Sequence, residues 1–169
     1  MAKRLLVFLM LGSVTSHGDH SDAGHHQCGS EILFANGTVD FRRAAPCTAL
    51  LLDETGIRGD KLIPIAEAFN SMSELRVVSL HGNRIGDKGA AILAKGLENK
   101  RSALSELYLD NNIIGNVGFA QLGAALSKNS ALKVLDLDYN PANDDGIGSL
   151  VEKLHLNNAL ESLDLIALD

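Results

Sequence analysis

The stretch Leu75-Arg-Val-Val-Ser-Leu-His-Gly-Asn83 returns along the chain with its apolar positions almost unchanged. Copies follow one another at intervals of 28 or 29 residues, starting at Cys47, Leu75, Leu104, Leu132 and Leu160. A fixed period of this length indicates a stack of similar units, because one unit cannot bury its own apolar face. The repeat therefore predicts one elongated domain with a continuous core.

The first half of each unit has the alternation of a strand with one buried face. Val78 and Leu80 are apolar and Ser79 between them is polar, which is the period of two of an extended chain. Asn83 stands where the chain must turn, and its amide can bond backbone groups that lack a ladder partner. The same position is filled in other copies by Asn112, Asn140 and Thr55. We therefore expect an asparagine ladder, in which Thr55 does part of the work.

The second half of each unit has the pattern of a helix. Gly86-Asp87 opens the second copy, and Asp87 is expected to cap the N-terminus of that helix. Apolar residues then recur at helical spacing, and we expect them to face the core. They are Ile63, Ala66 and Phe69; Ala90, Ala91, Leu93, Ala94 and Leu97; Phe119, Leu122, Ala125 and Leu126; and Ile147, Leu150, Val151 and Leu154.

These motifs, with Asn-x-Ile-Gly-x-x-Gly after the strand and Leu-Ala-x-x-Leu in the helix, carry a resemblance. The chain resembles the ribonuclease-inhibitor-like class of leucine-rich repeats, similar to arrays in NOD-like receptors and Ran GTPase-activating proteins. The resemblance covers residues 48–169 and the preceding Cys47. It implies an α/β solenoid, curved, with parallel strands on the concave face, helices on the convex face, and about four repeats plus a truncated fifth. It leaves function open, because members bind unrelated partners.

The composition and the absence of catalytic motifs limit the classes of function that the sequence is expected to have. The net charge of −6 argues against non-specific nucleic-acid binding, which needs a basic face. Apolar residues make up 46% of the chain and aromatic residues 4%, which fits a Leu/Ala core rather than an aromatic ligand pocket. The sequence has no nucleophile elbow, HExxH motif or paired catalytic carboxylates. We therefore expect a binding protein, no enzymatic activity and no cofactor.

Residues 1–16 have the order of a secretory signal peptide. Lys3-Arg4 precede the apolar run 5–11, and 14–16 offer small residues for cleavage. The run is too short for a membrane-spanning helix. The alternatives are a buried strand or an incorrect gene start. We expect a secreted protein; free thiols and an unmodified Asn36 would favour a cytoplasmic one.

Residues 28–47 are expected to form an N-terminal cap. Cys28 and Cys47 are the only cysteines; in an oxidising compartment they form one disulfide, and otherwise they are two free thiols. Asn36-Gly37-Thr38 between them is an N-glycosylation sequon, and the same Asn-Gly pair favours the turn of a hairpin. A stapled hairpin here would cover the first repeat.

Two segments have a composition that suits metal ions. Residues 17–27 contain His17, His20, His25 and His26, but no ligand spacing fixes a geometry, so we expect a flexible linker. Asp136-x-Asp138-x-Asn140 starts like a calcium-binding EF-hand loop and then departs from it, because Pro141 and Ile147 replace the required Gly and Glu. We expect no metal site.

The last copy, which begins at Leu160, supplies a strand with no helix after it. Either the chain is a fragment of a longer protein or this edge pairs with something, since an uncovered apolar end invites association. Oligomeric state is left open.

The concave strand positions define the expected site. Asp136 should neighbour Asp164, and Asp110 should neighbour Asp138, because adjacent strands lie about 4.8 Å apart. Clustered like charges beside tyrosines suggest a cationic partner. The expected contact residues are Glu106, Tyr108, Asp110, Asp136, Asp138, Tyr139 and Asp164. We expect a module that binds a basic protein or peptide. The alternative is an intracellular regulatory array, of the NOD-like-receptor or Ran-GTPase-activator type, that is part of a larger protein.

Overall fold

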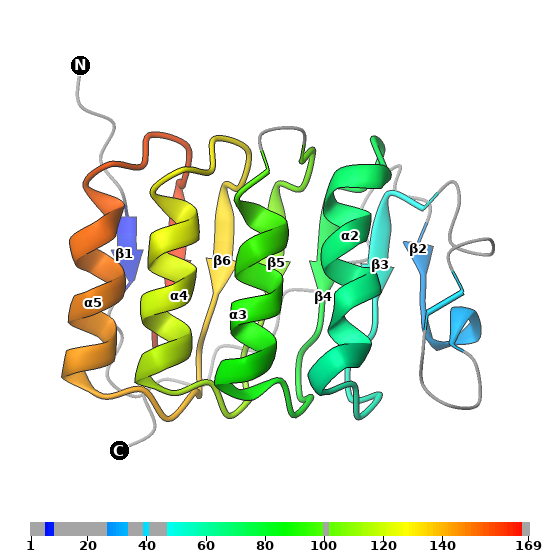
Figure 1. Ribbon diagram of the computed structural model, residues 1–169, viewed down its shortest axis with the longest axis horizontal. Coiled ribbons are helices and arrows are strands. Elements are labelled where there is room, and N and C mark those ends of the chain that lie inside the picture. The colour runs from blue at the N-terminus through cyan, green and yellow to red at the C-terminus, as the bar shows by residue number, and fades with distance from the viewer. Residues whose placement is uncertain (1–5, 9–26, 34–38, 41–46, 100–101, 167–169) are drawn as a thin grey trace.

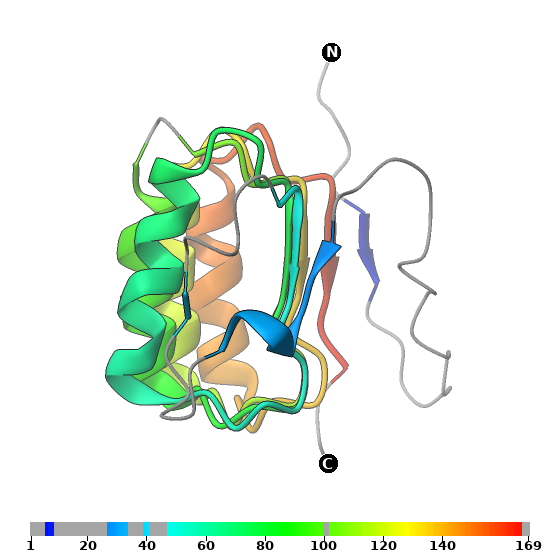
Figure 2. The same cartoon turned by 90° about the vertical axis from the view of Figure 1, so that its right-hand side faces the viewer.

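The computed structural model describes residues 6–8, 27–33, 39–40, 47–99 and 102–166. Short strands alternate with helices along most of this part. The elements are β1 (Leu6–Phe8), β2 (Gln27–Cys28), η1 (Ser30–Ile32), β3 (Ala49–Leu51), η2 (Gly59–Leu62), α2 (Ile63–Ser71), β4 (Val77–Ser79), α3 (Gly86–Leu97), β5 (Glu106–Tyr108), α4 (Asn116–Leu126), β6 (Val134–Asp136), α5 (Asp144–Leu154) and β7 (Ser162–Asp164). Helices α2 to α5 all lie on one side of the sheet (Figure 1, Figure 2).

The strands form one parallel sheet in the order β1-β7-β6-β5-β4-β3-β2. Middle residues pair in register across neighbouring strands, and from β3 to β7 they are 1% exposed or less: Leu50, Val78, Leu107, Leu135 and Leu163. The residues on either side of them point away from the helices, to what we call the outer face. The α/β class and the parallel sheet are confirmed, while the number of repeats stays a prediction.

The helices close the core from the other side. Leu93, Leu122 and Leu150 are fully buried, as the apolar stripes predict. Four stripe residues are not buried as expected. Ile63 is 43% exposed and Val151 is 41% exposed, and Ala91 and Ile147 are partly exposed. Val151 lies on the side of α5 where a following helix would pack, and the described residues place none there.

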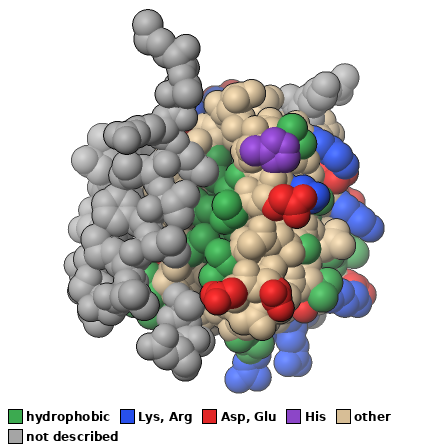
Figure 3. Space-filling view, turned by 90° about the vertical axis from the view of Figure 1, so that its left-hand side faces the viewer, with side chains coloured by type: hydrophobic (Ala, Val, Ile, Leu, Met, Phe, Trp, Pro, Cys, Tyr) green, Lys and Arg blue, Asp and Glu red, His purple; other side chains and the backbone are tan. Residues whose placement is uncertain are grey.

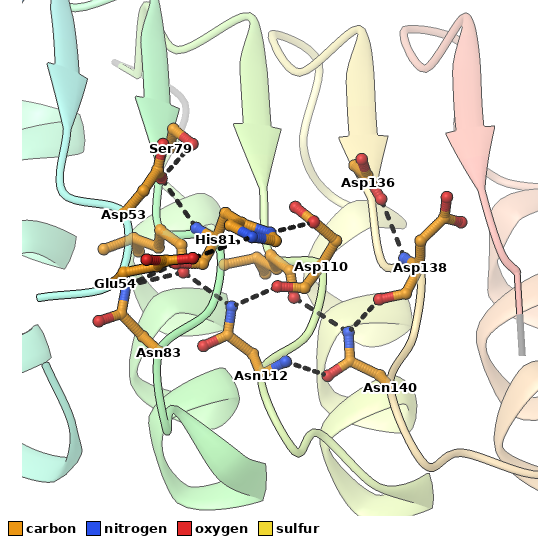
Figure 4. A network of polar contacts seen from close by, with 12 residues as sticks. Asp53, Glu54, Ser79, His81, Asn83, Asp110, Asn112, Asp136, Asp138 and Asn140 are labelled. Atoms are coloured by element: carbon orange, nitrogen blue, oxygen red, sulfur yellow. Dashed lines mark hydrogen bonds and ion pairs between the residues drawn. The ribbon is translucent and has the colours of Figure 1, made fainter. Parts of the chain in front are cut away.

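The asparagine ladder is confirmed. The Oδ1 atom of Asn140 accepts hydrogen bonds from the backbone N–H groups of Asn112 (3.0 Å) and Ile114 (2.9 Å). Its Nδ2 group donates to the carbonyls of Leu109 and Leu137, so one side chain bonds two successive turns. Asn83 likewise joins its own turn to the preceding one, as Figure 4 shows for part of the ladder.

Thr55 stands at the start of this ladder. Its hydroxyl donates to the carbonyl of Leu52 at 2.8 Å and lies 3.3 Å from Asn83 Oδ1. The partial substitution of threonine for asparagine is therefore as predicted.

The predicted role of Asp87 is wrong. Helix α3 begins at Gly86, so Asp87 lies within its first turn rather than before it. Its Oδ1 atom instead accepts from the N–H groups of Gly115 (2.7 Å) and Gly118 (2.9 Å), at the start of the next helix. The carboxylate caps α4 across the repeat boundary, which the sequence of a single repeat does not reveal.

The N-terminal cap has the expected disulfide between Cys28 and Cys47, both buried. Leu33 and Val39 form an antiparallel bridge, as the hairpin requires, while Asn36 and its turn lie outside the described residues. The linker residues His17, His20, His25 and His26 also lie outside them.

Within the predicted signal peptide, Leu6–Phe8 forms β1, which pairs with β7 at the opposite end of the sheet from β2 (Figure 1). This is the strand that the sequence left as an alternative to a leader. The strand alternative is therefore observed at Leu6–Phe8, while removal of residues 1–16 as a leader stays a prediction.

Candidate functional site

The outer face changes character along the sheet. On β3 and β4 it carries small or apolar side chains that are mostly covered, such as Ala49 (2% exposed) and Val77 (6%). On β5 to β7 it carries Glu106, Tyr108, Val134, Asp136, Ser162 and Asp164, all partly exposed. The acidic half of the sheet is therefore the half whose outer side chains are accessible to solvent.

The register brings Tyr108, Asp136 and Asp164 into one row, because Tyr108 pairs with Asp136 and Asp136 pairs with Asp164. The predicted neighbour relation of the two aspartates is confirmed. Neither carboxylate forms an ion pair with a described residue; Asp136 accepts one hydrogen bond, from the N–H of Asp138 at 2.9 Å. Two partly buried carboxylates thus lie side by side on the outer face.

Burial and crowding change how these acids ionise. Burial raises the pKa of Asp136 to about 7; the hydrogen bond from the Asp138 backbone opposes this rise, and repulsion from Asp110, Asp138 and Asp164 adds to it. The pKa of Asp164 is also raised, first by burial and then by Asp138. Near neutral pH the row carries charge that a cation would stabilise.

Tyr108 is the hydrogen-bond donor of this row. Its hydroxyl donates to Glu106 Oε2 at 2.9 Å. Burial raises the pKa of Tyr108, and the bond to Glu106 and the nearby carboxylates raise it further. The phenol therefore stays protonated and keeps its ring fixed beside Asp136.

A second polar cluster lies at the ends of β3, β4 and β5 (Figure 4). The Nδ1 atom of His81 contacts Asp110 Oδ2, and its Nε2 atom lies 3.9 Å from Glu54 Oε1. Asp53 accepts hydrogen bonds from the Ser79 hydroxyl and from the His81 backbone N–H (2.9 Å). These contacts fix the turns after three successive strands.

Asp110 belongs to this second cluster rather than to the accessible row. It is 1% exposed and contacts His81, so its carboxylate is not accessible at the outer face. Asp53, His81 and Asp110 follow one another at intervals of 28 and 29 residues, so they share one column of the repeat.

Asp138 and Tyr139 lie in the turn after β6. Asp138 Oδ1 accepts from the backbone N–H of Ile166 at 2.6 Å, the same cross-repeat contact that Asp53 makes with His81. Tyr139 has a left-handed backbone (φ 55°) and is partly exposed. Its side chain is therefore presented beside the acidic row from a conformation that a bulky residue rarely adopts.

That left-handed turn recurs in the four repeats whose turn is described, and it was not predicted. The residues at its position are Glu54, Gly82, Asn111 and Tyr139, with φ between 54° and 63°. Gly82 and Asn111 tolerate this conformation, which is the signal the sequence offered. Each N–H of this set bonds the carbonyl one repeat further on, from Glu54 to His81 through Tyr139 to Ile166.

Among the described residues no group of three or more His, Cys, Asp or Glu side chains is arranged to hold a metal ion. None of the described helices has the length and hydropathy needed to cross a bilayer.

No family model matches this chain, and no curated protein matches it. Fifty-nine chains of solved structures do match. One of them is Leiomodin-1 Actin-Binding Site 2 (ABS2), with a TM-score of 0.63 and 22% identity over 73% of this chain and 73% of that chain. At this identity the likeness shows the fold alone. The chain has a fold of the leucine-rich-repeat type, and its place in the ribonuclease-inhibitor-like class stays a resemblance.

Proposed function

We propose that this protein is a leucine-rich-repeat module that binds a basic protein or peptide on the outer face of β5 to β7. The observation that carries the proposal is the row of Asp136 and Asp164, two adjacent carboxylates with raised pKa and no cationic partner among the described residues. Like charges side by side destabilise a sheet, so a bound cation would stabilise this surface by reducing the repulsion between the two carboxylates.

The form of the surface favours a macromolecule over a small ligand. The row of Tyr108, Asp136 and Asp164 runs across three parallel strands, and Tyr139 lies in the turn after β6. Tyrosine is enriched at interface centres because a rigid ring offers apolar area together with a polar tip. The structural likeness to an actin-binding part of leiomodin-1 is consistent with a protein partner. Binding rather than catalysis is part of the proposal.

Charge should govern the approach of the partner more than its final affinity. Exposed ion pairs contribute about 0.2–1 kcal/mol each and are screened by salt. We therefore expect the association rate to fall as ionic strength rises, with the apolar contacts of Tyr108 and Tyr139 retained.

We also propose that the protein acts in the secretory pathway or outside the cell. The disulfide between Cys28 and Cys47 supports this, because such bonds persist in oxidising compartments. Intact mass of the protein recovered from a eukaryotic secretory host tests it. Loss of residues 1–16, an oxidised cysteine pair and a glycan on Asn36 are expected. A full-length, reduced, unmodified chain retained in the cell would favour the intracellular array.

The binding proposal is tested by calorimetric titration with a twelve-residue peptide of alternating Lys, Arg and Ser. The test variant combines Glu106→Gln, Asp136→Asn and Asp164→Asn, which removes three charges and keeps the acceptors for Tyr108 and for the Asp138 N–H. We expect the Kd to rise about tenfold, as three weak ion pairs imply.

The matched control removes three charges from the helix side, with Glu67→Gln, Asp145→Asn and Glu152→Gln, all exposed. It should leave the Kd within about twofold, the residual effect of net charge alone. Equal losses in both variants would show that net charge, and not the outer face, captures the peptide. No binding by the parent chain would refute a basic partner.

A further inference from the structure

The side of α5 that faces away from α4 is unusually exposed for a repeat helix. Val151 occupies the position that Ala94 and Gly123 hold in α3 and α4, and those two are buried. Ile147 is partly exposed, and Gly148 has no side-chain neighbour within 4 Å of the place where a Cβ would stand. We call Asp144, Ile147, Gly148 and Val151 the α5 end face.

The preceding helices show what these positions do. A Cβ at Gly123 would lie 3.0 Å from the Cα of Leu150, so this position of α4 touches the next helix directly. One turn earlier, the Ala90 side chain of α3 meets Gly118 of α4, where an added Cβ would lie 3.0 Å from it. The counterparts on α5 are Val151 and Ile147. Both are therefore in positions that pack against a following helix.

Asp144 can be compared in the same way with the equivalent residues of the two preceding helices. Its counterparts are Asp87, which caps the first turn of α4, and Asn116, which exchanges hydrogen bonds with Asn143 at the start of α5 (2.7 and 3.0 Å). Asp144 itself is exposed and makes no side-chain hydrogen bond or ion pair with the described residues. It presents a carboxylate where the two earlier residues meet the N-terminus of the next helix.

Beyond β7 the described residues fill the sheet layer with β1 and place no helix in the helix layer. β1 pairs with β7 in the register that β6 uses, with Val7 and Leu135 both opposite Leu163. In the described part of the chain no helix accompanies β1. Figure 3 looks onto this end and shows hydrophobic side chains gathered in its middle, with acidic side chains at its lower edge.

We propose that the α5 end face docks an α-helix supplied by a partner protein, parallel to α5, with its first turn at Asp144. The free N–H groups of a helix N-terminus carry partial positive charge, which suits a carboxylate. The partner helix needs glycine or another very small residue at its third position. Gly118 and Gly146 hold that position in α4 and α5, where an added Cβ would come within 3 Å of Asp87 and Asn116.

A second copy of this chain fits less well. A two-fold axis perpendicular to α5 would run the two helices in opposite directions and bring the carbonyl end of one helix to Asp144 of the other. A two-fold axis parallel to α5 would bring the two Asp144 carboxylates together. Like charges meet in both arrangements. The inference does not depend on the proposed acidic binding site, which lies on the other side of the sheet layer.

The test extends the protein at Asp169 with a copy of its own residues 142–159, which continues the repeat in register and supplies a helix with a glycine at its third position. If the end face accepts a helix, circular dichroism should gain the ellipticity of about one further helix the length of α5, and Tm should rise by about 4 °C or more. Val151→Asp should abolish both gains and leave Tm of the unextended chain nearly unchanged.

The matched control is Val117→Asp, an exposed valine (61%) on α4 that should leave both gains in place. A leucine at the third position of the appended helix should abolish them. An appended segment that adds no helix, or a gain indifferent to Val151→Asp, would overturn the proposal. Sedimentation of the unextended chain should show a monomer; a dimer lost on Val151→Asp would assign the face to a second copy instead.

Discussion

Asp136 combines burial with several neighbouring carboxylates, and both disfavour its ionised form. Its folded-state pKa of about 7 stands above the ordinary value of 3.8, so the folded state binds the proton more tightly than the unfolded state. The resulting stabilisation is complete below about pH 4 and is lost as pH rises through 7.

The substitution Asp136→Asn should therefore raise the free energy of unfolding by about 1–3 kcal/mol at pH 8. At pH 4 the free energy of unfolding should change little. The amide oxygen still accepts from the Asp138 N–H. Urea unfolding of both proteins at the two pH values measures the effect. Equal stability at pH 8 would mean that Asp136 is solvated in the folded protein.

Ile113 carries backbone strain on an exposed side chain. Its φ is 59°, a conformation that β-branched residues avoid, and the side chain is 59% exposed. Ile113→Asn should raise the free energy of unfolding by about 1 kcal/mol, because asparagine tolerates the left-handed region. Thermal unfolding measures this. Val117→Asn, exposed in a helix, is the control and should give no gain; destabilisation by Ile113→Asn would contradict the account.

At this scale the sequence predicted neighbours within a strand row and missed those in the turns. Asp136 beside Asp164 follows from the period and the parallel register alone. The burial of Asp110 does not, because it depends on how the turn after β4 places the ring of His81. Turn geometry is set by backbone angles, and the presence of an aspartate or a tyrosine does not predict those angles.

Among the elements, the asparagine turns join one repeat to the next. Asn140 is 2% exposed, and both ends of its amide are used by backbone groups of two turns. Asn140→Ala should lower the free energy of unfolding by about 2–4 kcal/mol, since several buried backbone groups lose their partners. Denaturant unfolding measures it, with the exposed Asn158→Ala as the control. A loss below that of the control would show that water replaces the amide.

The helices show why capping was harder to predict than packing. The apolar stripes follow from spacing within one helix, whereas Asp87 caps α4, whose first turn lies 28 to 31 residues further on. The burial predicted for Val151 is wrong for a related reason. The equivalent positions in α3 and α4 are buried because a following helix packs against them, and the described residues place no such helix beside α5. Both errors arise at contacts between units, which a single repeat does not contain.

Across the whole molecule, the two ends of the sheet are covered differently. At the β2 end, Cys28 and Cys47 tie the cap to the first strands. The double variant Cys28→Ser/Cys47→Ser should lose about 3 kcal/mol of stability in the chain-entropy model of a short closed loop. Hydrogen exchange should accelerate in β2 and β3 and stay unchanged in β6 and β7. Uniform acceleration would mean that the cap and the array unfold together.

The acidic outer face is the central claim, and mapping where a basic peptide binds tests it most directly. Amide resonances of the ¹⁵N-labelled protein would be followed while the Lys/Arg/Ser peptide is added. We predict saturable shifts confined to β5, β6 and β7 and the turns that follow them, centred on Tyr108, Asp136 and Asp164. Shifts confined to the helices α2 to α5, or absent from these three strands at saturation, would contradict the account.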